Sequence, residues 1–196
     1  MSRTRLAIGA GVVVAAVATL WILFVGVPRW YRPRTPDAAP AAQQPGPPAA
    51  ERKITATLFF ISEDGMSLQP VQREVAFGDP VTEQARRIIE AQIAAAPAPL
   101  ASAIPAGTRV RALYVSERGD AFVDLTGEVT AKHTGGALDE LFTVYALVNA
   151  LTVNLPAISR VQILIDGKEA DTLAGHVDLR HPLSKNMKWI KADNPS

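Results

Sequence analysis

The chain has 196 residues, of which 48% are hydrophobic and 20% charged, a composition typical of a globular protein. Residues 1–53 carry seven Lys/Arg against two Asp/Glu, whereas residues 54–196 carry 13 against 17. The basic charge therefore gathers near the N-terminus and the remainder is mildly acidic, which argues against a nucleic-acid-binding surface. Cysteine is absent, which excludes disulfides, thiolate chemistry, Cys-ligated zinc and a lipid anchor on an N-terminal cysteine.

The N-terminal part of the sequence predicts a membrane anchor. After a short head (residues 1–5), Leu6–Val27 is an uncharged apolar run of 22 residues. As a helix it would reach about 33 Å, enough to cross a bilayer. A cleaved signal peptide is the alternative, but its apolar region is normally shorter and ends in small residues, whereas Pro28 and Arg29 follow here. We expect a transmembrane signal anchor with its head in the cytoplasm, although the flanking charges nearly balance.

Residues 28–52 are predicted to be a linker between this anchor and a folded domain. Pro33–Ala50 contains six prolines and no apolar periodicity, which indicates a semi-extended tether. We expect the folded domain over residues 53–190, which is long enough to bury a substantial core, and a short tail over residues 191–196.

The first half of the domain predicts two strands and a helix. Lys53–Ile61 is rich in β-branched and aromatic residues, and Met66–Val75 reads as an edge strand because it contains a proline. Asp79 is expected to cap the helix, with Pro80 at its first position. Prolines at positions 97 and 99 end it. Its apolar face consists of Val81, Ala85, Ile88, Ile89 and Ile93.

A hairpin and a central helix follow. The strands Arg109–Ser116 and Asp120–Thr126 are joined by a three-residue turn. Gly136–Asn154 then predicts a helix that packs on most of its sides, because its apolar stripe is wider than half the circumference. That stripe consists of Leu138, Leu141, Phe142, Val144, Tyr145, Leu147, Val148, Leu151 and Thr152.

The C-terminal third predicts further strands. Arg160–Ile165 alternates apolar and polar residues, and the Asp166-Gly167 pair after it is a strong hairpin signal. We expect strands over Lys168–Leu173 and Ala174–Leu179. The order ββαββαβ(β) predicts an α+β domain in which two helices pack on one face of a largely antiparallel sheet.

Several stretches spread over the domain also carry a family resemblance. They are Leu58–Phe60 with Glu63–Gly65, Ile104–Thr108, Ala121–Leu125, Val144–Thr152, Val161–Gly167 and Thr172–Leu179. In this order they resemble the GerM-type (GerMN) domain of bacterial sporulation and germination proteins, which is also found in other bacterial envelope proteins. The resemblance implies a non-catalytic domain outside the cytoplasmic membrane, with a fold related to the ring-building motifs of secretion and sporulation machines. This chain differs from GerM in having one domain copy. It differs from the lipoprotein members in having an apolar segment where they carry a lipidated cysteine.

The residues most suited to chemistry lie near the C-terminus. His176 and Asp178, with His181 beyond, would point to the same side of an extended segment and could bind a metal or act as an acid–base pair. A metal site would need a third ligand, for which the candidates are Asp124, Glu128 and His133. The alternative is that His176 and Asp178 bond each other or nearby backbone at a buried turn. We expect no catalytic residue, metal or cofactor.

Two further polar residues are candidates for ligand contacts, together with His176 and Asp178. Asn149 lies on the apolar central helix, where it either bonds to neighbouring backbone or contacts a ligand. Asp124 ends a strand and is a turn acceptor or a ligand contact.

The sequence therefore favours a single-pass protein of a bacterial cytoplasmic membrane. Its extracytoplasmic module would bind or scaffold peptidoglycan or envelope proteins without catalysis. Two alternatives stay open: a metal-assisted cell-wall hydrolase using His176 and Asp178, and a ring-forming homo-oligomer joined through sheet edges. Metal content, mass by light scattering, and a pull-down on peptidoglycan sacculi distinguish them.

Overall fold

The computed structural model describes residues 19–21 and 52–191. The chain divides into two compact units, Met1–Ala49 and Ala50–Ser196. In the first unit only residues 19–21, which are helical, are described. The predicted head, nearly all of the predicted membrane span and the linker up to residue 51 thus lie outside the described residues. Within the part that is described, no helix has the length and apolar character needed to cross a membrane.

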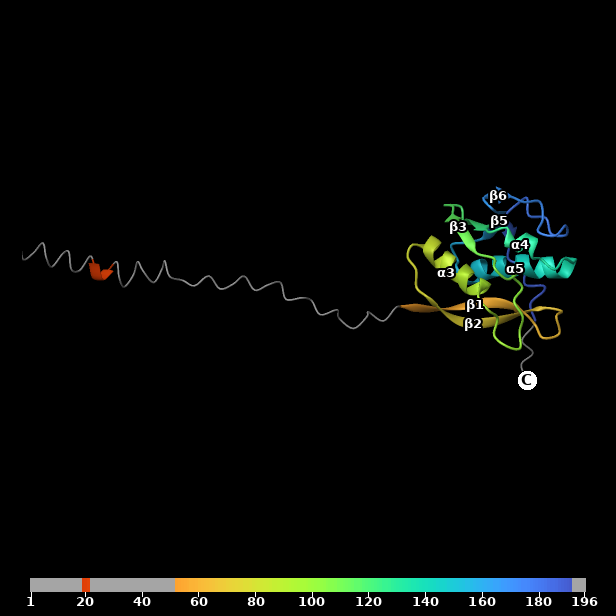
Figure 1. The fold of residues 1–196 in the computed structure, drawn as a ribbon, viewed down its shortest axis with the longest axis horizontal. Coiled ribbons are helices and arrows are strands. Elements are labelled where there is room, and N and C mark those ends of the chain that lie inside the picture. The colour runs from red at the N-terminus through yellow and green to blue at the C-terminus, as the bar shows by residue number, and fades with distance from the viewer. Residues whose placement is uncertain (1–18, 22–51, 192–196) are drawn as a thin grey trace, which may run out of the picture. The chain divides into compact units, whose positions relative to one another are not determined.

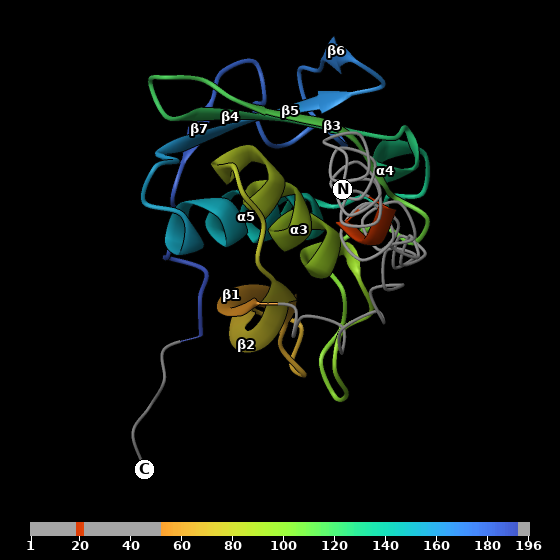
Figure 2. The same cartoon turned by 90° about the vertical axis from the view of Figure 1, so that its left-hand side faces the viewer.

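The second unit is a mixed α+β domain in which the long helices lie between two sheets (Figures 1 and 2). Its elements are β1 (Lys53–Ile61), β2 (Leu68–Ala76), α3 (Val81–Ile93), β3 (Val110–Val115), β4 (Asp120–Leu125), α4 (Glu128–Ala131), α5 (Ala137–Asn154), β5 (Arg160–Ile165), β6 (Lys168–Glu169) and β7 (Leu183–Ser184). The α+β class is confirmed. The prediction of one sheet with both helices on one face is wrong, because β1 and β2 form a sheet of their own that no other strand joins, and α3 and α5 form a middle layer.

Helix side chains explain why β1 does not join the second sheet. On α3, the Gln92 amide donates to the carbonyl of Phe59 (2.7 Å) and accepts from its N–H (2.8 Å). On α5, the Asn154 amide bonds Thr57 in the same way, at 2.7 and 2.8 Å. The edge of β1 that does not pair with β2 is therefore bonded by two side-chain amides, which take the place of a neighbouring strand.

The second sheet has the order β3-β4-β5-β6, and β7 pairs with β5 as well. β4 and β5 are parallel, from Asp120 opposite Arg160 to Leu125 opposite Ile165. The other strand pairs are antiparallel, as predicted, but the prediction did not include this parallel central pair. Parallel neighbours require a long crossover connection, and here α4 and α5 supply it.

The middle layer also explains the wide apolar stripe of α5. Residues on most of its circumference are fully buried, among them Phe142, Val144, Leu147 and Leu151. Because a sheet lies on each side and α3 lies beside it, a helix in this position has almost no solvent-facing surface. The prediction of a helix that packs on most of its sides is confirmed.

Three local predictions differ from the structure. The first is the cap of α3: Pro80 occupies the cap position and makes no side-chain bond there, so the prediction that Asp79 caps the helix is wrong. The second is α4, a four-residue helix that the sequence did not indicate. The third is the strand expected over Ala174–Leu179, which does not form, while β6 is only two residues long. One edge of β5 is shared by two short strands: β6 pairs with its C-terminal end and β7 pairs with Arg160 and Val161 at its N-terminal end. The chain after the turn therefore continues as a loop instead of a longer strand.

The edge bonds of Gln92 are expected to make a large contribution to stability. Gln92→Ala leaves the buried N–H and carbonyl of Phe59 without partners, and each unpaired group costs about 1–3 kcal/mol. We therefore expect a fall of about 2–4 kcal/mol in the free energy of unfolding, measured by urea denaturation. Gln72→Ala on the exposed part of β2 is the control and should change stability by less than about 0.5 kcal/mol. Equal effects of the two substitutions would contradict this account.

The unit Ala50–Ser196 is expected to fold without the preceding residues. Every core residue of the described chain lies within it, from Ala56 to Leu179. A fragment of residues 50–196 should therefore unfold in a single cooperative transition, followed by far-UV and near-UV circular dichroism. Transitions that do not coincide, or the absence of a near-UV signal, would contradict this expectation.

Candidate functional site

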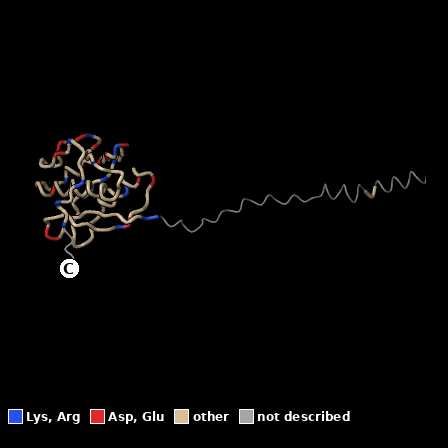
Figure 3. Tube along the Cα trace, turned by 180° about the vertical axis from the view of Figure 1, so that it is seen from behind, with Lys and Arg blue, Asp and Glu red and all other residues tan. Residues whose placement is uncertain are grey.

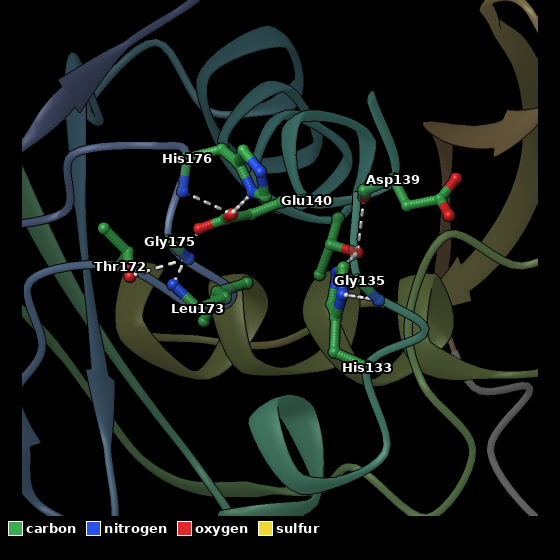
Figure 4. A network of polar contacts seen from close by, with 9 residues as sticks. His133, Gly135, Asp139, Glu140, Thr172, Leu173, Gly175 and His176 are labelled. Atoms are coloured by element: carbon green, nitrogen blue, oxygen red, sulfur yellow. Dashed lines mark hydrogen bonds and ion pairs between the residues drawn. The ribbon is translucent and has the colours of Figure 1, made fainter. Parts of the chain in front are cut away.

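A network of polar contacts lies around the N-terminal half of α5 (Figure 4). The chain enters the helix through Gly135 and Gly136, whose φ angles of 83° and 91° suit glycine. Gly136 is the cap residue and has no side chain that could bond the first amides of the helix. Glu140, one turn further on, is a carboxylate with no exposed surface.

The Glu140 carboxylate is held by the backbone of the loop that follows β6. Oε1 accepts from the amide of Leu173 and Oε2 from the amide of His176, both at 2.8 Å. Nδ1 of His176 lies 3.0 Å from the same Oε2. Burial opposes ionisation, but the amides of Ala174, His176, Leu173 and Val177 outweigh it and lower the pKa of Glu140. An ionised carboxylate thus organises this loop.

The contacts of His176 determine which ring nitrogen carries the proton. Because Oε2 of Glu140 is an acceptor, Nδ1 carries the hydrogen and Nε2 is left as the acceptor of the neutral ring. The side chain of His176 is 44% exposed. Among the described residues, no hydroxyl group bonds to this imidazole. The arrangement orients a histidine without supplying a nucleophile.

A second histidine lies on the other side of the α5 entry. The Gly135 amide donates to Nδ1 of His133 at 3.0 Å, so Nδ1 is unprotonated and Nε2 faces Thr143 Oγ1 at 3.2 Å. Thr143 in turn donates to the carbonyl of Ala103 at 2.5 Å. This chain of bonds ties the loop before α5 to the loop before β3.

Two hollows lie near these residues. A pocket of about 240 Å³ is lined by Ile61, Ser102, Ala103, Ile104, Pro105, Lys132, His133, Thr134, Asp139 and Thr143. A more open groove of about 700 Å³ is lined by Arg109, Thr126, Gly127, Glu128, Thr130, Ala131, Lys132, Ile165 and Asp166. His133 and Glu128, both considered as metal ligands, therefore line different hollows.

The structure does not assemble His176 and Asp178 into one site. Asp178 forms an ion pair with Arg180 at 2.7 Å, and bonds to the Arg180 side chain and backbone lower the pKa of Asp178. Asp124 accepts from the Gly167 amide at 2.8 Å. Within residues 19–21 and 52–191, no cluster of three or more His, Asp or Glu could hold a metal ion.

Asn149 is a fully buried amide, and both of its polar atoms are bonded. Its Nδ2 donates to the carbonyl of Asn186 at 2.8 Å, and its Oδ1 accepts from the amide of Asn186 at 3.0 Å. The side chain therefore ties α5 to the segment after β7.

Glu140 is not among the residues predicted from the sequence, although a signal was present. Glu140 lies four, seven and eleven residues before Val144, Leu147 and Leu151, and so continues one apolar stripe of the helix. An acidic residue in a first turn is usually a solvated partner of the helix dipole. A carboxylate on a buried stripe instead indicates an internal role.

Comparison with known proteins places the chain in a family. The family model described as Germane: Sporulation and spore germination matches residues 57–171. The first GerMN domain of the sporulation protein GerM from Bacillus subtilis has 19% identity and a TM-score of 0.50, over 68% of this chain and 96% of that one. This likeness shows the fold alone.

Two further solved structures are similar. The tandem GerMN domains of the same Bacillus subtilis protein have 18% identity and a TM-score of 0.49, over 69% of this chain and 46% of that one. A "Putative Lipoprotein" from Clostridium perfringens has 23% identity and a TM-score of 0.49, over 68% of this chain and 88% of that one. No curated protein matches the sequence. Since the family model spans more than half of the residues, the resemblance inferred from the sequence is confirmed, and the chain belongs to the Germane family of sporulation and spore germination domains.

Proposed function

We propose that this protein is a non-catalytic scaffold of the bacterial cell envelope. Its Leu6–Val27 segment holds it in the cytoplasmic membrane, and its GerMN domain faces the extracytoplasmic side. There the domain binds peptidoglycan or envelope proteins. The apolar N-terminal run and the Germane family membership support this location.

One observation carries the non-catalytic part of the proposal. The side chains best suited to chemistry hold the domain's own structure. Glu140 is bonded by loop amides and Asn149 by Asn186, while the half-exposed Asp178 is paired with Arg180. A catalytic group has to present a reactive atom to a substrate, whereas these groups are committed to internal bonds.

The partners of His176 and Asp178 also weigh against the hydrolase alternative. A metal-assisted hydrolase would use both side chains on one ion, with a third ligand and an open position for water. In this fold the imidazole is turned toward Glu140, while the carboxylate is turned toward Arg180. Of the three candidates for a third ligand, Asp124 and His133 are bonded to Gly167 and Gly135, and Glu128 lines a different hollow from His133.

The location is tested by membrane fractionation and protease access. The full-length chain should stay in the membrane fraction of bacterial cells after a carbonate wash, because a 22-residue apolar helix does not wash out. Protease added to intact spheroplasts should degrade the domain. A variant that lacks residues 6–27 is the control and should be soluble and protected inside the cell. Release of the wild-type chain by carbonate would contradict the tether.

The same preparation tests the scaffold role. The full-length chain is expected to be retained by peptidoglycan sacculi or to cross-link to an envelope protein, and to release no soluble muropeptides. His176→Ala serves as the matched variant. Muropeptide release by the wild-type chain that this substitution abolishes would overturn the non-catalytic assignment.

Glu140 is expected to act as a structural acid with a defined pH signature. Its folded-state pKa lies below the ordinary 4.5, so its stabilising effect is present at neutral pH and is lost as the pH falls through the lowered pKa. Glu140→Gln keeps one acceptor oxygen and turns an NH₂ group toward a loop amide. We expect it to cost about 2–4 kcal/mol at pH 7 in urea unfolding.

This cost should shrink as the pH falls below the ordinary 4.5 and through the lowered pKa of Glu140, because protonation weakens the wild-type bonds. Glu117→Gln, in the exposed β3–β4 turn, is the control and should have little effect at any pH. A pH-independent cost at position 140 would contradict the ionised state.

A further inference from the structure

The last described segment of the domain is unlike the rest in charge. Lys185–Lys191 contains three lysines and no acidic residue. Residues 52–184 carry 12 Lys/Arg against 16 Asp/Glu, a net charge of −4, and Figure 3 shows the two signs interspersed along the chain. The segment is thus a basic patch on an acidic domain.

The same segment exposes large apolar side chains. Met187 is 45% exposed and Trp189 is 38% exposed, and the lysines on either side of them are exposed as well. Tryptophan is normally well buried, so a solvent-facing tryptophan among lysines indicates a surface that meets a partner.

Backbone bonds hold both ends of this segment in place. Asn186 is bonded twice to the buried Asn149 of α5. At the other end, the Leu68 amide of β2 donates to the carbonyl of Trp189, and the Lys191 amide donates to the carbonyl of Leu68, both at 2.8 Å. Because these bonds fix the backbone, the tip between them presents its side chains in a preformed arrangement.

The turn between β1 and β2 adds to this surface. Met66 in that turn is 67% exposed, and the bridge between Leu68 and Ile190 joins the turn to the segment. The same turn carries two exposed acids, Glu63 and Asp64, and Oδ1 of Asp64 accepts from the Ser62 hydroxyl and from the Met66 amide. The Asp64 carboxylate is therefore bonded within its own turn, so the three lysines of Lys185–Lys191 outnumber the acids beside them.

We propose that Lys185–Lys191, together with Met66, is a contact site for an anionic lipid surface. Lysines are attracted to anionic head groups, each raising the partition coefficient roughly fivefold. Tryptophan and methionine enter the boundary between head groups and acyl chains. The charge of the patch, opposite to that of the rest of the domain, favours lipid over a neutral or basic partner.

The biological role of this contact rests on the proposed membrane tether, although the lipid affinity does not. Three lysines and one tryptophan give only weak binding from solution, but a tether supplies a high effective concentration. The linker of residues 28–52 can span at most roughly 80 Å, and the nine-residue β1 covers about 30 Å. The patch can therefore reach the bilayer that holds the anchor.

The full chain offers a direct optical test. Its three tryptophans are Trp21, Trp30 and Trp189, so the Trp21→Phe/Trp30→Phe variant reports from the patch alone. Placed in nanodiscs of phosphatidylcholine with phosphatidylglycerol, its emission should shift to the blue and be quenched by brominated lipid. High salt should reverse both changes. The same emission in nanodiscs of pure phosphatidylcholine as in the anionic ones would overturn the proposal.

Variants of the 50–196 fragment, expected to fold alone, measure the contribution of charge. Lys185→Gln/Lys188→Gln/Lys191→Gln should weaken binding to phosphatidylglycerol vesicles roughly 100-fold in co-sedimentation. Because Lys191 and Trp189 contact β2 through backbone atoms, these substitutions leave the fold intact, which circular dichroism verifies. The matched control, Arg86→Gln/Arg118→Gln/Lys168→Gln, removes the same charge elsewhere. An equal loss in the control set would overturn the assignment to this patch.

The outcomes separate this proposal from the tether. If carbonate releases the full chain but the fragment still binds anionic vesicles through its lysines, the tether fails and the lipid site stands. If the full chain stays membrane-bound but the Trp189 emission does not depend on lipid charge, the lipid site fails and the tether stands. Absence of vesicle binding would overturn the lipid proposal, and retention by peptidoglycan sacculi that the three lysine substitutions abolish would assign the patch to the wall polymer.

Discussion

Buried backbone N–H and C=O groups have to be hydrogen-bonded. In several segments no neighbouring strand provides the partner, and side chains of α5 provide it instead. Four of its polar side chains reach the backbone of four separate segments. These pairs are Glu140 with Leu173 and His176, Thr143 with Ala103, Asn149 with Asn186, and Asn154 with Thr57. Gln92 of α3 does the same for Phe59. Side chains of the middle layer therefore bond backbone groups that no strand pairs with. These bonds hold irregular loops in fixed positions.

This arrangement explains why polar residues on an apolar helix need not indicate catalysis. A carboxylate, a hydroxyl and two amides look like a constellation of reactive groups when read along the sequence. In space they reach different segments, because Glu140, Thr143 and Asn154 lie at different heights along one side of the helix and Asn149 lies on the opposite side. The hydrogen-bonding groups of each side chain are largely paired with nearby backbone. The rigid domain that results is suited to presenting its surface to partners.

A side chain of α5 that bonds to loop backbone also positions the surface that we assign to lipid. The segment after β7 has no long strand to follow, since β7 is only two residues long. Its path over the domain depends on Asn149 at one end and on the β2 backbone at the other. Without those two attachments Trp189 and its neighbouring lysines would lie on a free tail, and ordering them would reduce any binding. A buried amide on α5 thus supports an exposed patch.

Local patterns in the sequence were sufficient for β1, the β3–β4 hairpin, α5 and the turn after β5, because periodicity and turn residues act over a few neighbouring positions. The family resemblance also followed from the order of these stretches. Three features depended on contacts between segments 33 to 97 residues apart: the two-sheet arrangement, the burial of Glu140 and the separation of His176 from Asp178. No local pattern states which backbone group a side chain will meet. The sequence therefore determined the elements and the family, and the packing of α5 between the sheets decided which polar residues became structure and which stayed on the surface.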